Sequence, residues 1–599
     1  MRVKNNIFII FIFTFTCVII FRIWLISGIP KWITYSPHDG LYYARLANYI
    51  IHGQWFGPYS KMTLIKAPFY SFFMIFSFLT GLPLLLNETL LYLGSCFVLY
   101  VSLSPLIKNK WWRLILFIVM LYCPATLANG RTLAVYREFV YFSLTLYLVA
   151  FAIGMFLRLD KKISSSIIWG AGLGLSIGFF LITREEGVWI YPALFFYFLV
   201  VVINIIVKGN LKFKKNRILI VLMVILIAYT PTGLISLANY HYYGFFGISE
   251  NLDTDFNRVI NTLGSIKTDK WYPYSPVTKE SLTIAYSSSP LFRELKPSIE
   301  KYNDAWLVLS INNVKSKPDW YQEKYLKGYE TYEIGSLFVW SLRDVLSDQG
   351  YYSNGKFPRD FLQELADQLE DACNNNIVCL SKTTNLPRLS YIRKEHLPII
   401  LDFFIDDFIN LINYDKAFTK IASLDVKNRN PQTYKPEFRY FKQFIYNPID
   451  YYTGDNLHTD YEQNFIINGK TDIRLVILRY KESIMKSIYS LYKYFTIPMM
   501  ILFVFLWLLS LIVNIFKKSL KSHKYNIQAI FIFLFTMSLL LTRMVTLSIA
   551  EGTSSLPANY AASNYIFFYI VLFIMGYYLR IVIIDNINTF KNKISNLYN

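Results

Sequence analysis

Long apolar runs separated by short polar stretches constrain this chain more than any other feature of its sequence. The first run covers residues 7–26, and its roughly 20 residues are enough for a helix to cross the ~30 Å hydrocarbon core of a bilayer. No small-residue cleavage site follows it, so we interpret it as a retained first membrane helix. The pattern predicts an all-α polytopic membrane protein with about 10–12 transmembrane helices. Further apolar blocks lie at 67–84, 88–106, 112–128, 138–157, 166–183, 187–207, 217–238, 494–515, 526–548 and 564–582.

The charge distribution separates a membrane part from a hydrophilic part. The net charge of +20 alone would suggest nucleic-acid binding. However, 32 of the 40 acidic residues lie in residues 239–493, where 31 Lys and Arg balance them. The excess positive charge therefore belongs to the membrane part, as expected of cytoplasmic loops, and we expect no nucleic-acid partner.

Clusters of basic residues predict the orientation, because Lys and Arg near helix ends stay preferentially in the cytoplasm. Placing the clusters inside puts residues 28–66, 129–137, 184–187, 239–493 and 549–563 outside. Residues 67–106 must then cross the membrane once in total, although Gly81, Pro83 and Asn87 divide them into two helices. A re-entrant or half-depth segment would reconcile the two observations. The clusters are Lys108, Lys110 and Arg113; Arg158, Lys161 and Lys162; Lys212, Lys214, Lys215 and Arg217; and Lys517, Lys518, Lys521 and Lys524.

Three domains follow: an N-terminal transmembrane module (1–238), an extracytoplasmic soluble domain (239–493) and C-terminal transmembrane helices (494–599). Residues 359–372 and 394–412 show helical spacing, and 472–494 runs into the next membrane helix, so the soluble domain is predicted to be mostly helical. Cys373 and Cys379 either form a local disulfide or remain two unlinked thiols. The domain has no metal-ligand cluster or nucleophile motif, and either binds an acceptor and caps a site or is purely structural.

Acidic residues are rare in the membrane part, and charges there are usually kept for function. Asp39, Glu138, Glu185, Glu186 and Glu551 map to the external face, Asp160 and Asp585 map inside, and Glu88 stays unassigned. Together with nearby basic residues, the external acids predict a polar cavity that opens outward. Chance placement of solvated loop charges is the alternative. The basic residues are Lys66, Arg131, Arg137, Arg184 and Arg543.

The first external loop, residues 28–66, is the most informative segment. Its apolar spacing after residue 39 predicts a short amphipathic helix at the membrane surface. Ser36, Pro37 and Asp39 match a capping box, so Asp39 either only caps this helix or also serves chemistry as a stabilised carboxylate. Lys66, at the end of the loop, either binds a phosphate or only snorkels from a helix end.

These residues resemble a known family. Asp39, Gly40, Leu41, Tyr42, Tyr43 and Ala47, followed by Lys66, Ala67, Pro68 and Tyr70, resemble the membrane glycosyltransferases of the GT-C fold, in particular the protein O-mannosyltransferase and aminoarabinose transferase branch. Arg184, Glu185, Glu186 and Gly187, with Pro192, are similar to a turn in these enzymes. The resemblance covers the N-terminal third and implies that Asp39 is catalytic and that Lys66 binds the lipid phosphate. Two departures are the single proline after Lys66 and His38 in place of a second acid, which argues against metal dependence.

The resemblance implies an inverting glycosyltransferase that takes its sugar from a polyprenyl phosphate in the bacterial inner (plasma) membrane. Its acceptor would be a glycan such as lipopolysaccharide, or another molecule. Membrane lipids are further partners, and no cofactor or metal is expected. Catalysis is assigned to Asp39; donor-phosphate binding to Lys66, Arg131, Arg137, Arg184 and Arg543; and substrate binding to His38, Tyr42, Tyr43, Glu138, Glu185, Glu186 and Glu551. Each arginine has an alternative role as a structural partner of an acid.

Three other classes of protein fit parts of the pattern. A transporter or polysaccharide flippase would show two related halves, and none are visible. A polysaccharide polymerase would depend on paired arginines in a large external loop. A receptor or assembly protein would use residues 239–493 to bind a partner and would tolerate neutralisation of Asp39.

Overall fold

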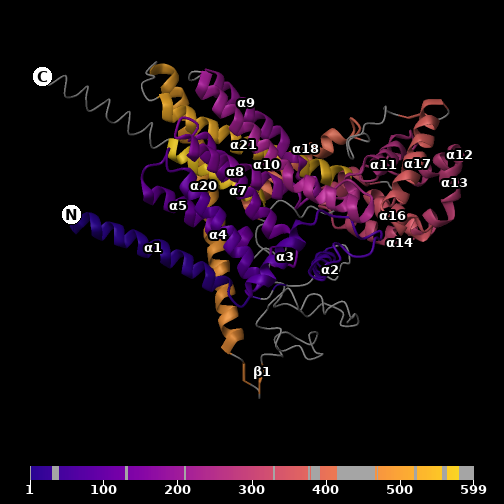
Figure 1. Cartoon of the computed structure of the whole chain (residues 1–599), viewed down its shortest axis with the longest axis horizontal. Helices are drawn as coiled ribbons and strands as arrows, with labels where there is room; N and C mark the ends of the chain where they lie inside the picture. Colours follow the sequence, from indigo (N-terminus) through magenta and orange to yellow (C-terminus); the bar gives the residue numbers. More distant parts are fainter. Residues whose placement is uncertain are drawn as a thin grey trace.

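The computed structural model describes residues 2–29, 31, 39–127, 132–207, 211–327, 331–375, 378–379, 392–414, 466–467, 470–471, 473–517, 523–555 and 563–578. Figure 1 shows two parts arranged along the longest axis of the molecule. One end is formed by a group of helices that runs from α11 (Thr254–Ser265) to α17 (Lys356–Asn375). Long apolar helices form the other part.

Seven helical stretches in the described part of the chain are long and apolar enough to cross a membrane. Two shorter apolar helices, α3 (Phe69–Thr80) and Asn564–Tyr578, accompany them. The prediction of an all-α polytopic membrane protein is therefore confirmed. The spans are formed by α1 (Arg2–Ile26), α4 (Leu84–Ser102), α7 (Glu138–Phe156), α8 (Ile163–Leu181), η1 (Glu185–Ile190) with α9 (Tyr191–Val207), α10 (Leu211–Tyr243) and α21 (His523–Thr553).

Helix α7 is the centre of the bundle. It is apolar on all sides, as expected of a helix surrounded by others, and packs between α4 and α8. Helix α8 packs closely on α10 through Gly174 and Gly178, where an added Cβ would lie 2.8 Å from the carbonyl oxygens of Val224 and Ala228. Small residues at four-residue spacing allow this approach, because apolar lipid gives helices little hydrophobic reason to associate.

Helix α3 does not cross the membrane. Its 12 residues span about 18 Å, less than the thickness of a bilayer core. Both of its ends lie near the first turn of α4, because Tyr70 donates a hydrogen bond to Glu88 at 2.9 Å and Asn87 donates to Thr80 at the same distance. At the other end of α4, Arg158 donates to the carbonyl of Ser102 at 2.9 Å. Residues 67–106 therefore make a single crossing, in agreement with the half-depth segment inferred from charge.

We call the end of the bundle near Glu88 the domain end, because the hydrophilic domain packs there, and the opposite end the far end. Three of the four predicted basic clusters lie at the far end, where Arg113 and Arg158 donate to the carbonyls of Tyr100 and Ser102 and Arg217 donates to that of Lys161 at 2.5 Å. Lys518 and Lys521 of the fourth cluster lie outside the described residues. Helix α5 (Lys110–Leu121) starts from the same end, and the four-residue α6 (Pro124–Leu127) follows it.

The hydrophilic domain is mostly helical in its described residues, as predicted. Its core lies between α11, α16 and α17, and side chains cap its helices, as when Asp253 accepts from the backbone of Phe256 at 3.1 Å. The long helix α20 continues into the membrane part without a break, as the pattern at 472–494 predicted. The elements are η2 (Glu250–Leu252), α11, α12 (Lys279–Ser288), α13 (Pro290–Glu294), α14 (Lys296–Lys315), α15 (Asp319–Tyr325), η3 (Gly335–Leu337), α16 (Phe338–Asp348), η4 (Tyr351–Ser353), α17, α18 (His396–Asn413), the antiparallel strands β1 (Ile466–Ile467) and β2 (Lys470–Thr471), and α20 (Ile473–Lys517).

Cys373 and Cys379 form a disulfide, which decides between the two alternatives that the sequence left open. The bridge lies at the end of α17. Cys379 also pairs with Ile266, directly after α11, and Lys267 donates to the carbonyl of Val378 at 2.9 Å. The disulfide therefore fastens the end of α17 to the chain that leaves α11.

Candidate active site

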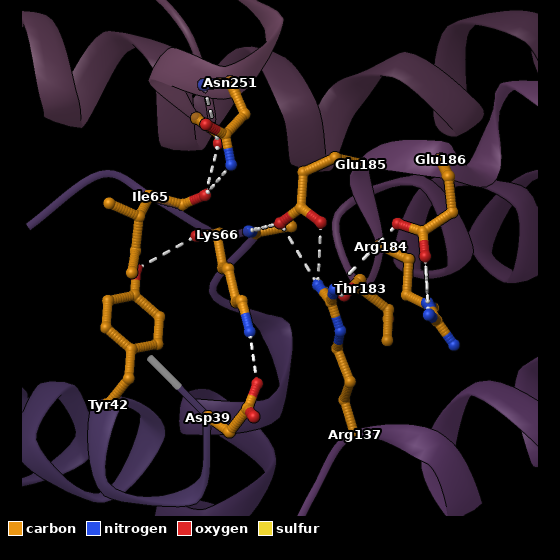
Figure 2. A network of polar contacts seen from close by, with 12 residues as sticks. Asp39, Tyr42, Ile65, Lys66, Arg137, Thr183, Arg184, Glu185, Glu186 and Asn251 are labelled. Atoms are coloured by element: carbon orange, nitrogen blue, oxygen red, sulfur yellow. Dashed lines mark hydrogen bonds and ion pairs between the residues drawn. The ribbon is translucent and has the colours of Figure 1, made fainter. Parts of the chain in front are cut away.

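Asp39 and Lys66 meet at the domain end of the bundle. Helix α2 (Gly40–Ile51) begins directly after Asp39, which occupies the N-cap position without a capping hydrogen bond from its side chain. The carboxylate lies 2.5 Å from Lys66 Nζ instead (Figure 2). The Asp39 side chain therefore forms an ion pair with Lys66 and does not cap the helix, and its catalytic role stays a prediction. Ser36, Pro37 and His38 lie outside the described residues.

The backbone around Lys66 is held by contacts from two other elements. Tyr42 of α2 donates from its hydroxyl to the Lys66 carbonyl at 3.0 Å, and the backbone N–H of Ala67 donates to the carboxylate of Glu185. The Lys66 side chain is 12% exposed, and its ammonium lies 5.6 Å from the ring centroid of Tyr136. Lys66 therefore extends into a protein-lined site rather than into solvent, which does not fit simple snorkelling.

The hydrophilic domain holds the two residues before Lys66. Ser249 and Asn251 both donate from their side chains to the Ile65 carbonyl, at 3.1 and 2.6 Å. The backbone N–H of Glu250 donates to the Leu64 carbonyl at 2.8 Å. Figure 2 shows Asn251 reaching Ile65 from the side opposite to Asp39. No sequence pattern points to Ser249 and Asn251, because they are uncharged and lie 184 and 186 positions from Ile65.

Arginines and glutamates form the second half of the site. Arg137, before α7, contacts both oxygens of Glu185 at 2.9 and 3.1 Å and donates to the Thr183 carbonyl at 3.0 Å. Arg184 lies 2.6 Å from Glu138 and 2.5 Å from Glu186. Because η1 starts at Glu185, its two acids project toward arginines on both sides. Arg137 and Arg184 therefore pair with acids, which is the alternative role that the sequence left open for each arginine.

Two aromatic rings join Arg543 of α21 to this group. Its guanidinium lies 5.3 Å from the ring of Trp189 and 5.7 Å from that of Tyr141. Arg184 lies 5.0 Å from the Tyr141 ring. Three segments far apart in sequence thus meet at the domain end.

Glu551, eight residues after Arg543, contacts the hydrophilic domain. Lys317 donates from its ammonium to the backbone carbonyl of Glu551. Burial lowers the pKa of Lys317 to about 7, although the Glu551 carboxylate acts in the opposite direction. Glu551 therefore lies where α21 meets the domain, and its assigned role in substrate binding stays a prediction. Arg131 lies outside the described residues.

The described site has as many acidic as basic side chains. Asp39, Glu138, Glu185 and Glu186 face Lys66, Arg137, Arg184 and Arg543. The side chains of Asp39 and Glu186 are 37% and 41% exposed, whereas the other two carboxylates are 12% exposed or less. Asp39 and Glu186 are therefore the carboxylates that a ligand can reach most readily.

Tyr42 and Tyr43 are fully buried and pack against the residues of the site. The ring of Tyr43 packs edge-on against Tyr70 and lies 6.0 Å from the Arg137 guanidinium. Tyr70 in turn donates to Glu88, which forms a buried ion pair with Lys31, so Glu88, which the sequence left unassigned, is linked to the site through Tyr70 and Tyr43. Among the described residues, no group of three or more His, Cys, Asp and Glu side chains is arranged to hold a metal ion.

Comparisons with known proteins give a limited result. No protein-family model matches the sequence, and no curated protein matches it. Two solved structures of ArnT from Cupriavidus metallidurans align with the chain at 12% identity. The alignment with the apo structure covers 95% of this chain and 77% of that protein, with a TM-score of 0.30. The alignment with the structure bound to undecaprenyl phosphate covers 94% of this chain and 76% of that protein, with a TM-score of 0.31. ArnT is an aminoarabinose transferase, from the branch that the N-terminal motifs resemble.

Proposed function

We propose that the chain transfers a sugar from a polyprenyl-phosphate donor to an acceptor hydroxyl at the domain end of the membrane bundle. The observation that supports this most directly is the contact between Asp39 and Lys66, 2.5 Å apart, at the edge of the membrane helices. A base and a phosphate-binding cation are the two groups that this reaction requires side by side. The N-terminal motifs resemble a family that performs the same reaction.

In the proposed reaction, the acceptor hydroxyl attacks the anomeric carbon from the side opposite to the phosphate. Its proton passes to the Asp39 carboxylate as the new carbon–oxygen bond forms. The bond between the anomeric carbon and the phosphate oxygen breaks, and its electron pair leaves with the polyprenyl phosphate. One in-line displacement inverts the anomeric configuration.

Lys66 has a different partner before and after the donor binds. Without a donor, its ammonium neutralises Asp39. A donor phosphate competes for that ammonium, because hydrogen bonds from ammonium groups to phosphate are among the strong charge-assisted ones. Binding of the donor thereby releases Asp39 to accept a proton from the acceptor.

The described arginines of the site form two groups: Arg137 and Arg184 pair with acids, whereas Arg543 lies against aromatic rings. Arg137 is engaged with Glu185, which also accepts from the backbone beside Lys66, so we assign Arg137 to positioning Lys66. Arg184 is buried between Glu138 and Glu186. Arg543 lies against aromatic rings, and we assign it to the phosphate as a second cation.

The membrane is proposed to be the bacterial inner membrane, with the hydrophilic domain on the outer side. The disulfide supports this orientation, because such bonds persist in oxidising compartments. The basic residues at the far end agree with a cytoplasmic location for that end. The acceptor would then be a cell-envelope glycan, such as lipopolysaccharide, or another molecule on the outer face.

The test incubates purified protein in lipid nanodiscs with a panel of polyprenyl-phosphate sugars and measures release of free polyprenyl phosphate. Asp39→Asn should reduce turnover by about 10²–10⁴-fold, the usual contribution of a general base. The matched control is Asp348→Asn, because Asp348 is also 37% exposed and paired with a lysine, 3.7 Å away. Full turnover in Asp39→Asn would contradict the proposal, as would movement of the intact donor without cleavage of its sugar–phosphate bond.

A further inference from the structure

Helix α18 has a continuous stripe of exposed apolar side chains. They recur at three- and four-residue spacing, which places them on one face of the helix. Each is between 41% and 63% exposed, unusual for large apolar groups on a domain that is otherwise hydrophilic. They are Leu397, Leu401, Ile405, Phe408 and Ile409.

The acidic residues of α18 lie off this stripe. Asp402 pairs with Lys324 of α15 at 2.6 Å, and Asp406 accepts a hydrogen bond from Asn410 at 2.7 Å. Asp407 is 1% exposed. Asp402 and Asp406 therefore border the stripe with polar partners on the protein, and Asp407 is buried, so no carboxylate projects from the stripe itself, as in helices that lie in a membrane interface.

The two ends of α18 belong to different parts of the protein. At its start, His396 contacts the Pro273 carbonyl at 3.1 Å, within the hydrophilic domain. Next to it, Gly552 near the end of α21 packs against Ile399 and Ile400. Figure 1 shows α18 between α21 and the group formed by α11 to α17.

The residue after α18 is buried among membrane helices. The Tyr414 hydroxyl donates to Tyr569 at 2.7 Å and lies 2.8 Å from the hydroxyl of Thr496 in α20. Tyr569 is five residues inside the apolar helix Asn564–Tyr578, or about 8 Å along its axis. Leu411 and Tyr414 also belong to the same hydrophobic core as the spans. Helix α18 therefore descends from the domain to the depth at which the spans begin.

We infer that α18 is inserted into the outer part of the bilayer and that its stripe contacts lipid acyl chains. The opposite face of α18 packs on α21 through Ile399 and on Tyr321 of α15 through Phe403, which leaves the stripe on the outside of the described protein, beside the membrane helix α21. The preceding Arg393 and Lys394 then lie at the level of the lipid headgroups, where cations are favoured. The hydrophilic domain is thus anchored in the membrane by a helix of its own, in addition to the chain that connects it to α10 and α20.

A spin-label scan of α18 in lipid nanodiscs tests this inference. Single cysteines are introduced from position 396 to 412 in a Cys17→Ser background, because Cys17 is the exposed free cysteine of the described residues whereas Cys96 and Cys123 are buried. Collision of each nitroxide with oxygen, which concentrates in the bilayer, is compared with collision with a nickel chelate that stays in water. Val308 and Leu309 of α14 are the matched controls, since they are equally exposed apolar residues of the domain.

The oxygen-to-nickel collision ratio should peak at 401, 405 and 408 with a helical period and exceed the ratio at 308 and 309 several-fold. A high nickel collision rate at these peaks, equal to that of the controls, would overturn the inference. Low collision with both reagents would also overturn it, because the stripe would then be covered by protein. Neither readout requires enzymatic activity, so failure of the proposed function would leave this test intact.

Discussion

Replacing Arg343 with Met should weaken the attachment of the hydrophilic domain to the loop that contains Lys66. Arg343 of α16 lies 2.5 Å from Glu250, and the two side chains are only 2% and 8% exposed. Arg343 also donates to the Lys61 carbonyl at 2.7 Å. The backbone of Glu250 in turn binds Leu64, two residues before Lys66. Arg343→Met removes the cation and leaves the Glu250 carboxylate buried.

Leaving one member of a buried ion pair without its partner costs about 3–5 kcal/mol. Two tyrosines reduce this cost, because the hydroxyls of Tyr59 and Tyr352 donate to the same carboxylate. Burial raises the pKa of both, so they remain neutral donors over the ordinary pH range. We therefore expect the lower limit, about 3 kcal/mol, which lowers Tm by about 6–12 °C for a unit of 150–250 residues.

The assay follows thermal unfolding by tryptophan fluorescence in detergent. The double variant Arg343→Met with Glu250→Gln should lose less stability than the sum of the two single variants, because Glu250→Gln removes the charge that Arg343→Met leaves unpaired. Lys301→Met is the control: Lys301 is 63% exposed, its partner Asp348 is 3.7 Å away, and exposed pairs of this kind contribute little to stability. A shift in Arg343→Met no larger than that of Lys301→Met would refute the reasoning.

Three further predictions concern the domain. Since burial lowers the pKa of Lys317 from 10.5 to about 7, the unfolded chain binds more protons between these values. Stability should therefore rise from pH 7 to pH 10, by at most about 1.4 kcal/mol per pH unit, and Lys317→Met should flatten the Tm profile. Changing Cys373 and Cys379 to Ser should cost about 2 kcal/mol for so short a loop, and only the unchanged protein should lose stability when a reductant is added. Asn251→Ala removes the 2.6 Å hydrogen bond to Ile65 and should raise the donor KM about fivefold, with little change in kcat or in the pH profile of turnover. An equal fall in kcat would instead indicate a direct catalytic contribution.

The membrane architecture could be predicted because length and apolarity are local properties of a segment. The charge-based orientation required a single crossing of residues 67–106, which conflicted with the two apolar blocks in that segment and stayed open, and the structure adds that α3 is the part that does not cross. Asp39, Lys66, Arg137 and Arg184 could be selected because charged residues are rare near membrane helices.

The pairing of these charges could not be predicted. Whether Glu185 faces Arg137 or Arg184 depends on the direction in which η1 projects from the end of α8, which is set by packing. In the sequence, Glu551 was indistinguishable from the other external acids, but in the structure its backbone carbonyl accepts from Lys317 at the interface with the hydrophilic domain. Ser249 and Asn251 gave no signal because polar loop residues have no periodicity, and their function depends only on their position beside Ile65.

The equal numbers of carboxylates and cations in the described site have a consequence for ligand entry. A polyprenyl-phosphate sugar brings one negative charge into a neutral, partly dehydrated group, so its arrival is favoured if a proton or another cation enters with it. The product, a phosphate monoester, has a second ionisation near neutral pH and demands still more compensation. Uptake of the donor should thus be accompanied by uptake of another cation, or of a proton on a group other than Asp39, which must stay ionised to act as the base. Heats of binding that scale with the ionisation enthalpy of the buffer would reveal the proton.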